Sequence, residues 1–496
     1  MSVKDLSHPV DTVTQPVFIL METGFIVRNL LLGTFAESLA DRAPILIAVP
    51  DPHDPRLHSA LPHPQIQLTQ YLKPDPSAID GIGALLHFPS LMYRVKQVEK
   101  ASASMALQTK LFDGGGRVGR QKQLTREVLL GVSRVVKAAG ANGWLDSRYL
   151  EAIRGWTITR QWHETFRARR PCAVISTMLT HALPKAPSYD LPAVVAAHDL
   201  GIPVGTLVQS WDNLSSKSSL LPPWLDAIWT WSAFMRDELR EFHPRVPIER
   251  VAVVGSPQFD FHRDPGILQP RQTFMRALDL DPARPMIVIG TGTAVWLPQE
   301  PQIVATLIRD LRTALPDCQI LVRLHPKDHG ERWTPFRTDL EREGVVLQMT
   351  SPETHMDAGG FIPPLDFYRE QVNTLHHAAV VLNTASTLTV DAAIVDCPVI
   401  SLGYDIVPDD RFPEGRAWAY NNSTHFGNLV KTGGVWVVRS QEECVTAVKA
   451  YLADRGLHRA GRARIVEIAA GTVDGGAGER LADAVLALSE STRALV

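Results

Sequence analysis

Short apolar runs alternate along the chain with longer amphipathic segments, and this alternation predicts parallel βα units. In the first half we expect strands at Val17–Met21, Ile45–Val49, Cys172–Thr177, Val204–Gln209, Ala227–Trp231 and Val251–Gly255. In the second half we expect them at Met286–Gly290, Gln319–Leu324, Val345–Met349, Val380–Asn383, Val399–Leu402 and Val435–Val438. Several of these runs are apolar throughout, as expected of strands that are covered on both faces.

The chain length of 496 residues indicates two domains, each with its own hydrophobic core. Residues 196–204 and 392–399 both read as a helix end, a tight turn and a strand start, which favours two doubly wound sheets. Two prolines and two glycines within residues 255–266 are typical of a linker. We therefore expect a first domain at 1–265, a second at 266–475, and a C-terminal helix at 476–496 that crosses back to the first domain.

Between Asp75 and Arg170 the βα rhythm is lost, and the pattern predicts a helical insertion in the first domain. Basic residues outnumber acidic ones in this segment. They include Arg94, Lys96, Lys100, Arg117, Arg120, Lys122 and Arg126. One interpretation is a solvated helical insertion; the other is a surface for an anionic acceptor or for peripheral contact with a membrane leaflet.

The composition is that of an ordinary globular protein, with 45% hydrophobic and 21% charged residues. A net charge of −3 indicates no bulk attraction to nucleic acid. The 4 cysteines form no CxxC pair, so we expect buried thiols rather than disulfides or a zinc site. The N-terminus lacks the features of a signal peptide and no apolar run approaches a membrane span, so we expect a cytoplasmic protein.

The most specific motif is Leu321–Lys327, in which an apolar strand runs directly into Arg323, His325 and Lys327. In open α/β sheets, ligands bind at the carboxyl ends of the strands. Arginine offers a planar fork to phosphate oxygens, histidine can donate to the same group, and lysine adds a point charge. The motif therefore predicts a phosphate-binding loop; the alternative is a strand end with solvated basic residues.

A second motif, Val380–Ala393, reads as a strand, a hydroxyl-rich turn and a helix. Ser386 or Thr387 is expected near the helix N-cap, where hydroxyls and free backbone N–H groups can bind phosphate. Asn383 closes the strand before this turn. Ordinary helix capping is the alternative, but it needs only one hydroxyl.

A third element, Ile289–Thr293, contains Gly292 and Thr293 and lets a ligand approach the backbone closely. It is not the GxGxxG fingerprint, and no GxxxxGK[ST] loop occurs in the chain. The three elements follow three strands of one predicted sheet, so all should line one edge. Together they predict a pocket for a nucleotide phosphate in the second domain, with Tyr404 among the donor contacts.

The first domain supplies a candidate general base. The first strand ends at Glu22, which places a carboxylate in the first βα loop, facing the cleft between the domains. A base must lie close to the acceptor hydroxyl and have its pKa raised by partial burial. Arg28 and Asn29 can orient it; a helix cap or a solvated turn is the alternative reading of Glu22.

The segment Gln209–Lys217 concentrates amide, carboxylate, hydroxyl, ammonium and indole groups after a buried strand, a mixture that suits a carbohydrate. We expect an exposed Trp211 to stack on a sugar, with Asn213 and Lys217 binding its hydroxyls. Asp212 is the rival of Glu22 as base. His181 is a further acceptor candidate, although a lone loop histidine, like His425, is more often structural.

At this point the sequence resembles a glycosyltransferase of the GT-B type, with two facing Rossmann-like domains. The Arg323–Pro326 element is similar to the His-Pro motif of CDP-glycerol glycerophosphotransferases, bacterial polysialyltransferases and capsule Kdo transferases. The run Asn383–Thr389 resembles their hydroxyl-rich donor motif. The likeness covers Val17–Gly24 and Val204–Leu402. It implies that His325, Ser386 and Thr387 hold the donor phosphate and that Glu22 takes the place of the base.

The resemblance further implies metal-independent, inverting sugar transfer in surface polysaccharide, capsule or lipopolysaccharide assembly, without a cofactor. A cytidine nucleotide donor is favoured, and the acceptor is a glycan or a lipid-linked glycan. Asp51 and Asp54 lie in a proline-rich loop, and we assign no metal to them. Two alternatives stay open. One is a sugar-nucleotide 2-epimerase, but such enzymes usually carry a Glu-Arg-Pro-Glu segment after the donor motif, and Gly403–Ile406 does not match it. The other is a non-catalytic nucleotide- or glycan-binding module.

Overall fold

The computed structural model describes residues 15–24, 26–73, 131, 135, 138–180, 188–217, 220–294, 296–349, 362, 364–407, 409 and 412–493. Most of the predicted insertion lies outside these ranges, and so does His181. The basic residues singled out in the insertion also lie outside them: Arg94, Lys96, Lys100, Arg117, Arg120, Lys122 and Arg126.

In the described part of the chain, the first domain is built on a parallel sheet of seven strands in the order β3-β2-β1-β4-β5-β6-β7. Central strands such as β1 are buried at every position, so helices must cover both faces of the sheet. The strands are β1 (Val17–Leu20), β2 (Ile45–Val49), β3 (Ile66–Gln70), β4 (Ala173–Ser176), β5 (Val204–Leu207), β6 (Ala227–Thr230) and β7 (Val251–Val253).

The second domain, as far as it is described, holds a parallel sheet of six strands in the order β10-β9-β8-β11-β12-β13. This order repeats that of the first sheet, with β8 in the place of β1. The strands are β8 (Met286–Gly290), β9 (Gln319–Arg323), β10 (Val346–Gln348), β11 (Val380–Asn383), β12 (Val399–Leu402) and β13 (Val435–Val438).

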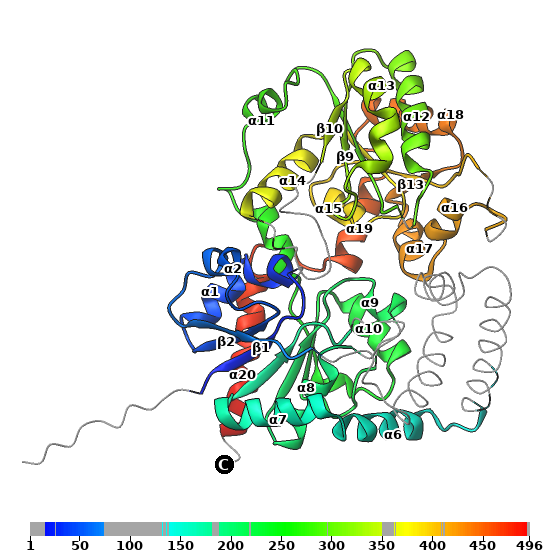
Figure 1. Cartoon of the computed structure of the whole chain (residues 1–496). Coiled ribbons are helices and arrows are strands. Elements are labelled where there is room, and N and C mark those ends of the chain that lie inside the picture. The colour runs from blue at the N-terminus through cyan, green and yellow to red at the C-terminus, as the bar shows by residue number, and fades with distance from the viewer. Residues whose placement is uncertain are drawn as a thin grey trace, which may run out of the picture.

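Helices surround both sheets, and Figure 1 shows the two domains one above the other, with the first domain below. The first domain contains α1 (Thr34–Ala40), α2 (Pro55–Ala60), α6 (Asn142–Arg154), α7 (Thr157–Arg169), α8 (Leu191–Asp199), α9 (Asn213–Ser216), α10 (Ala233–Phe242) and the short helices η1 (Val27–Leu31), η3 (Ile248–Arg250) and η4 (Pro257–Arg263). The second contains α11 (Arg271–Ala277), α12 (Glu300–Ala314), η5 (Glu331–Phe336), α13 (Arg337–Arg342), α14 (Leu365–His377), α15 (Leu388–Ile394), α16 (Arg416–Asn421), α17 (Thr424–Lys431), α18 (Gln441–Ala453) and α19 (Arg459–Ala469).

All twelve expected strands are present, with ends that shift by at most two residues. The sequence missed β3, a strand at the sheet edge with only partial burial. Its sequence IQLTQ carries too few apolar residues to stand out from a loop.

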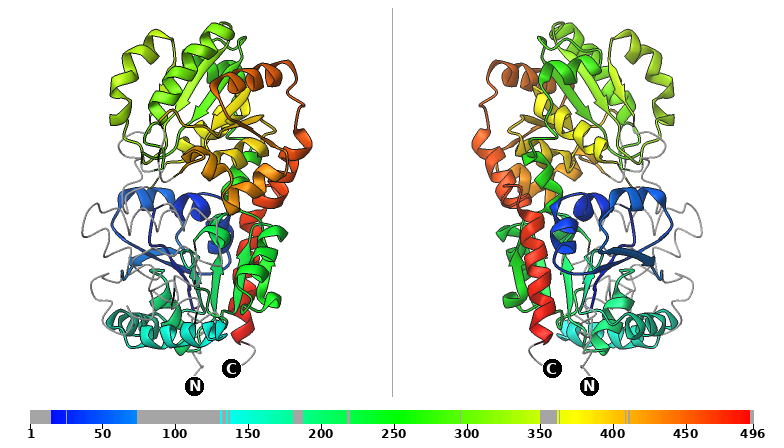
Figure 2. Two further views of the ribbon diagram at one scale, coloured as in Figure 1. Left: turned by 90° about the vertical axis from the view of Figure 1, so that its right-hand side faces the viewer. Right: turned by 90° about the vertical axis from the view of Figure 1, so that its left-hand side faces the viewer.

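The C-terminal helix α20 (Ala477–Arg493) packs against α1 of the first domain, and Figure 2 shows it running along that domain. The linker helix η4 anchors its start: the Asp260 carboxylate accepts hydrogen bonds from the Ala477 and Gly478 amides at 3.2 and 2.8 Å. The linker and the last helix are thus joined where the chain passes between the domains. The boundaries at 265 and 475 stay predictions.

Candidate functional site

A cavity of about 470 Å³ lies between the two domains. The second domain lines it with the loops that follow β8, β9 and β11, and the first domain with the loop after β5 and with η4. The carboxyl edges of the two sheets therefore face each other across this cavity. Ten predicted site residues are among its lining: Trp211, Asp212, Lys217, Gly292, Thr293, Arg323, His325, Lys327, Ser386 and Thr387.

The loop after β9 holds His325 in a defined orientation. Its backbone amide donates to the Thr291 hydroxyl at 3.0 Å, and its ring Nδ1 accepts from the Lys327 amide at 3.0 Å. With Nδ1 used as an acceptor, the neutral ring carries its proton on Nε2. The loop therefore offers an imidazole N–H to an anion, with Lys327 exposed beside it.

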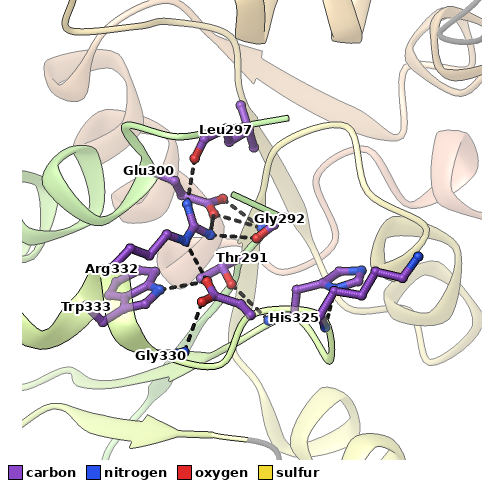
Figure 3. Close-up of polar contacts among 10 residues, drawn as sticks. Thr291, Gly292, Leu297, Glu300, His325, Gly330, Arg332 and Trp333 are labelled. Carbon is purple, nitrogen blue, oxygen red and sulfur yellow. Dashed lines mark hydrogen bonds and ion pairs between the residues drawn. The ribbon is translucent and has the colours of Figure 1, made fainter. Parts of the chain in front are cut away.

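A buried ion network joins this loop to the loop after β8 (Figure 3). The Arg332 guanidinium binds Asp328 at 2.7 Å, Glu300 at 3.0 Å and the Gly292 carbonyl at 2.7 Å. Glu300 in turn accepts from the Gly292 amide at 2.9 Å. Burial raises the pKa of Glu300 to about 7, although Arg332 and Gly292 act in the opposite direction. The network fixes the Gly292 backbone relative to the His325 loop.

Arg323, the last residue of β9, lines the cavity. Its Nη1 donates to Gln348 Oε1 at 2.6 Å and lies 3.7 Å from Glu370 Oε2, while the Phe367 ring lies 5.1 Å from the guanidinium carbon. Its Nη2 is buried and has no hydrogen-bond partner in the described part of the chain. Arg323 is thus held by protein groups on one side and keeps one donor atom for a ligand.

The loop after β11 combines hydroxyl groups with a strained backbone. Thr387 is the N-cap residue of α15, and Ser386 Oγ accepts from the Leu388 amide at 3.2 Å. Ala385 has φ of 44°, in the left-handed region that non-glycine residues rarely adopt. Such strain is common where a loop is shaped for binding. Asn383 does not line the cavity; it lies below the loop, where it bonds Thr389 at 3.1 Å.

The first domain contributes the loop that carries Trp211, Asp212 and Lys217. The expectation that Trp211 is exposed is wrong: it is 6% exposed and packs against the His425 ring, with centroids 5.5 Å apart. Burial by itself raises the pKa of Asp212, but Lys217, His425 and the hydroxyls of two serines outweigh it and lower this pKa to about 2. Asp212 is therefore an ionised group and a weak base.

Glu22, the first candidate for the general base, lies outside the cavity lining. Its carboxylate is 5% exposed, pairs with Lys73 Nζ at 2.9 Å and is not part of the cavity lining. Burial raises the pKa of Glu22, while Lys73 counteracts this. The expected first-loop carboxylate exists, and it forms an ion pair with a residue of the first domain. The Asn29 side-chain amide donates to the backbone carbonyl and the side-chain oxygen of Gln209.

Two further predicted contacts also lie away from the cavity. Asn213 is buried and donates to the Thr180 hydroxyl at 3.1 Å. Tyr404 is 9% exposed and packs in the core of the second domain. Within the described ranges, no group of three acidic, histidine or cysteine side chains can hold a metal ion, and no helix has the length and apolar character to cross a membrane.

No protein-family model matches the chain, and no curated protein matches it. It is similar to the S. aureus MnaA–UDP co-structure, at 12% identity and a TM-score of 0.51, over 96% of this chain and 97% of that one. It is similar to UDP-GlcNAc 2-epimerase from Neisseria meningitidis bound to UDP-GlcNAc, at 13% identity and 0.51, over 95% and 100%. The chain has a GT-B fold.

A structure of a glycosyltransferase from Rickettsia africae also matches, at 8% identity and a TM-score of 0.48, over 96% of this chain and 99% of that one. At these identities the likenesses concern the fold alone. The expected class, two facing Rossmann-like domains of the GT-B type, is confirmed, whereas activity has to be argued from the site.

Sequence reasoning missed part of the GT-B cavity. His262 of η4 and Asp391 of α15 line it and pair with each other, and Gln371 of α14 also bonds Asp391. His425 lines it as well, beside Trp211. The sequence shows a histidine in the linker, but it does not show the pairing of His262 with Asp391, because the residues around His262 come from distant segments.

Buried polar atoms without a hydrogen-bond partner gather around this cavity. Within the described part of the chain, the residues of its lining that carry such an atom include Gln209 Nε2, Trp211 Nε1, His262 Nδ1, Thr293 Oγ1, Arg323 Nη2 and His425 Nδ1. A buried polar atom that lacks a partner costs roughly 1–3 kcal/mol. Atoms of this kind, placed around a cavity from both domains, indicate a polar ligand that satisfies them.

Proposed function

We propose that the protein is a GT-B glycosyltransferase that binds a nucleotide-activated sugar between its domains and transfers the sugar to a hydroxyl of a glycan or lipid-linked acceptor, with inversion. The observation that carries this proposal is the cavity itself. Basic and hydroxyl side chains from three loops of one sheet line it opposite a polar, aromatic loop of the other. Unpartnered polar atoms from both sides call for a polar ligand.

In this proposal the donor phosphate is held in the second domain. His325 Nε2–H, Lys327 and Arg323 Nη2 donate to its oxygens, together with the hydroxyls of Ser386 and Thr387. Fixed donors of this kind stabilise the charge that develops on the leaving phosphate. The Gly292–Thr293 backbone, pinned by Glu300 and Arg332, leaves room for the nucleoside. No metal ion or cofactor is part of the proposal.

The acceptor is proposed to lie against the first-domain loop. Lys217 and the ionised Asp212 can bind sugar hydroxyls, and the Trp211–His425 pair forms an aromatic wall. A cytidine nucleotide as the donor rests on the His-Pro resemblance alone. Surface polysaccharide assembly and peripheral membrane contact rest on the same resemblance and on the basic insertion.

A sugar-nucleotide 2-epimerase is the second candidate, favoured by the fold of the two neighbours described above. Against it stands the segment after β12. Where those enzymes usually carry a Glu-Arg-Pro-Glu sequence, this chain has Gly403–Ile406, and Asp405 accepts from backbone amides at the start of α16. An epimerase needs no acceptor, and this difference separates the two reactions.

A thermal-shift panel of CMP, CDP, UDP and GDP tests the proposal first, because a ligand that binds the folded state raises Tm. Incubation with UDP-GlcNAc, CDP-glycerol, CMP-sialic acid and CMP-Kdo then follows, with detection of free nucleotide and of sugar isomers. A transferase releases nucleotide, and the rate rises with an acceptor glycan. An isomer without any acceptor supports the epimerase, and binding without either product supports a binding module.

A further inference from the structure

Sugar transfer to a hydroxyl requires a group that takes the hydroxyl proton, and neither carboxylate expected in that role is suited to it. Glu22 is paired with Lys73 outside the cavity lining. Asp212 is at the cavity, but with a pKa of about 2 it binds a proton too weakly to be an efficient base near neutral pH.

His262 lies at the boundary between the domains and lines the same cavity. It belongs to η4, the last element before the second domain, and its side chain is 3% exposed. Its Nε2 lies 3.4 Å from Asp391 Oδ1 of α15, across the domain boundary. Its Nδ1 is buried and has no hydrogen-bond partner in the described ranges.

The Asp391 carboxylate determines which nitrogen of the ring is available. A carboxylate accepts a hydrogen bond from an imidazole N–H, so the neutral ring carries its proton on Nε2 and a lone pair on Nδ1. Gln371 Nε2 donates to the same Asp391 oxygen at 3.2 Å and helps to hold it in place. This is the arrangement of a base with an orienting carboxylate behind it.

Asp391 also links the base to the donor loop. It lies in the first turn of α15, one turn after Thr387, so the carboxylate that orients His262 belongs to the same helix as the proposed phosphate contacts. A Cβ on Gly290 would collide with Leu388, so this helix start packs closely on the end of β8. The relative position of the base and the leaving group is therefore set by packed elements.

We infer that His262, oriented by Asp391, is the general base of the proposed sugar transfer. The inference rests on the proposed function. The acceptor O–H proton moves to His262 Nδ1, the acceptor oxygen bonds to the anomeric carbon, and the bond from that carbon to the donor phosphate breaks. The electron pair stays on the phosphate oxygen, near His325 and Ser386. The Asp391 carboxylate stabilises the imidazolium that forms.

The charged groups around the ring are few in the described part of the chain. Asp391 approaches from α15, and His376 of α14 lies close enough to interact with the ring electrostatically. His376 is exposed, lies near the end of α14 and is not part of the cavity lining. It therefore serves as a matched control of the same residue type.

The test uses the full chain and four variants: His262→Ala, His262→Gln, Asp391→Asn and His376→Ala. Glutamine keeps an amide that can donate to Asp391 but cannot act as a base, so it covers the case in which alanine fails to fold. Nucleotide release from UDP-GlcNAc, CDP-glycerol, CMP-sialic acid and CMP-Kdo is measured from pH 5 to 9, alongside the thermal shift that the matching nucleotide produces.

We expect both His262 variants to lose at least about 100-fold in kcat and to keep the thermal shift with nucleotide. The wild-type rate should fall on the acid side of the profile, where the base is protonated, and this decline should vanish in His262→Gln. Asp391→Asn, a positioning change, should lower kcat with little change in KM, and His376→Ala should behave like wild type.

Wild-type release by His262→Gln, with an unchanged acid limb, overturns the inference and leaves the proposed function standing. Loss of the nucleotide thermal shift in His262→Gln assigns the residue to binding and also overturns it. If the wild-type protein binds none of the nucleotides, or binds them without releasing any, the proposed function itself fails, and the inference fails with it.

Discussion

The loops after β1 and β8 hold the same place in two sheets of the same strand order, yet they are built differently. After β1, the loop carries Glu22, which is turned into an ion pair with the half-exposed Lys73. After β8, the loop begins with Thr291, Gly292 and Thr293, and the Gly292 backbone is hydrogen-bonded by Glu300 and Arg332.

This difference separates two uses of a buried glutamate. In the second domain, Glu300 shapes a loop whose backbone lines the cavity. In the first domain, Glu22 occupies the loop but is not part of that lining. Topology therefore predicts which edge of a sheet binds ligands. The ion pairs that hold each loop decide which of its groups line the cavity. The predictions below test this contrast.

The largest expected effect concerns His325, on the second-domain side. His325→Ala removes one fixed donor to the leaving phosphate and should lower the rate of nucleotide release by roughly 100-fold, without a change in Tm beyond a few degrees. The control is His329→Ala, an exposed histidine four residues later that is not part of the cavity lining. Equal rates for the two variants would reject the assignment of His325.

The next effect concerns the support behind the loop. Arg332→Met leaves Glu300 and Asp328 buried without their cation, which should cost about 3–5 kcal/mol. For a domain of this size the melting temperature should fall on the order of 10 °C. Arg337→Met breaks an exposed pair with Glu341 and is the matched control. A Tm loss in Arg332→Met no larger than in the control would mean that the network does not stabilise the second domain.

A smaller, pH-dependent effect is expected for Glu238, which lies buried on α10 near the Asp212 loop. Burial raises the pKa of Glu238 to about 8, although the nearby Ser215 hydroxyl acts to lower it. Its unfolded pKa is 4.5, so between about pH 4.5 and 8 the folded state binds more protons and stability falls as pH rises.

Glu238→Gln removes this titration. The Tm of the variant minus that of the wild type should therefore increase from pH 5 to pH 9, measured by thermal unfolding in matched buffers. Glu241→Gln, three residues later, provides the control. A difference that is flat across this range would show that Glu238 has no raised pKa in the folded protein.

The smallest effect is expected for Glu22→Gln. Because the Glu22 carboxylate is engaged with Lys73 and is not part of the cavity lining, nucleotide release should stay within about threefold of wild type, and stability within about 1 kcal/mol. A rate loss comparable to that of His325→Ala would restore Glu22 as the base and refute the contrast drawn here.

Much of the fold could be predicted from the sequence because most buried strands are short, largely apolar runs. β3 escaped because its apolar positions alternate with polar ones at a sheet edge. The site was predictable where its residues follow a strand directly, as His325 and Ser386 do, since the ends of parallel strands meet at one edge.

The remaining site residues could not be predicted, because their roles depend on contacts between distant segments. Glu22 forms an ion pair with Lys73, which lies 51 residues later, and no sequence motif marks Lys73 as its partner. The proposed role of His262 depends on its contact with Asp391, which lies 129 residues away. Trp211 is covered by His425 from the other domain. Spacing along one chain does not encode such pairs.

The central claim is that a nucleotide phosphate binds in the interdomain cavity through the loops after β9 and β11. Calorimetric titration tests it most directly, with whichever of CMP, CDP, UDP and GDP gives the largest thermal shift. The account predicts a single site, with a Kd at least about tenfold weaker in a Ser386→Ala/Thr387→Val double variant and unchanged in His329→Ala. Equal affinity in the double variant and the wild type would contradict it.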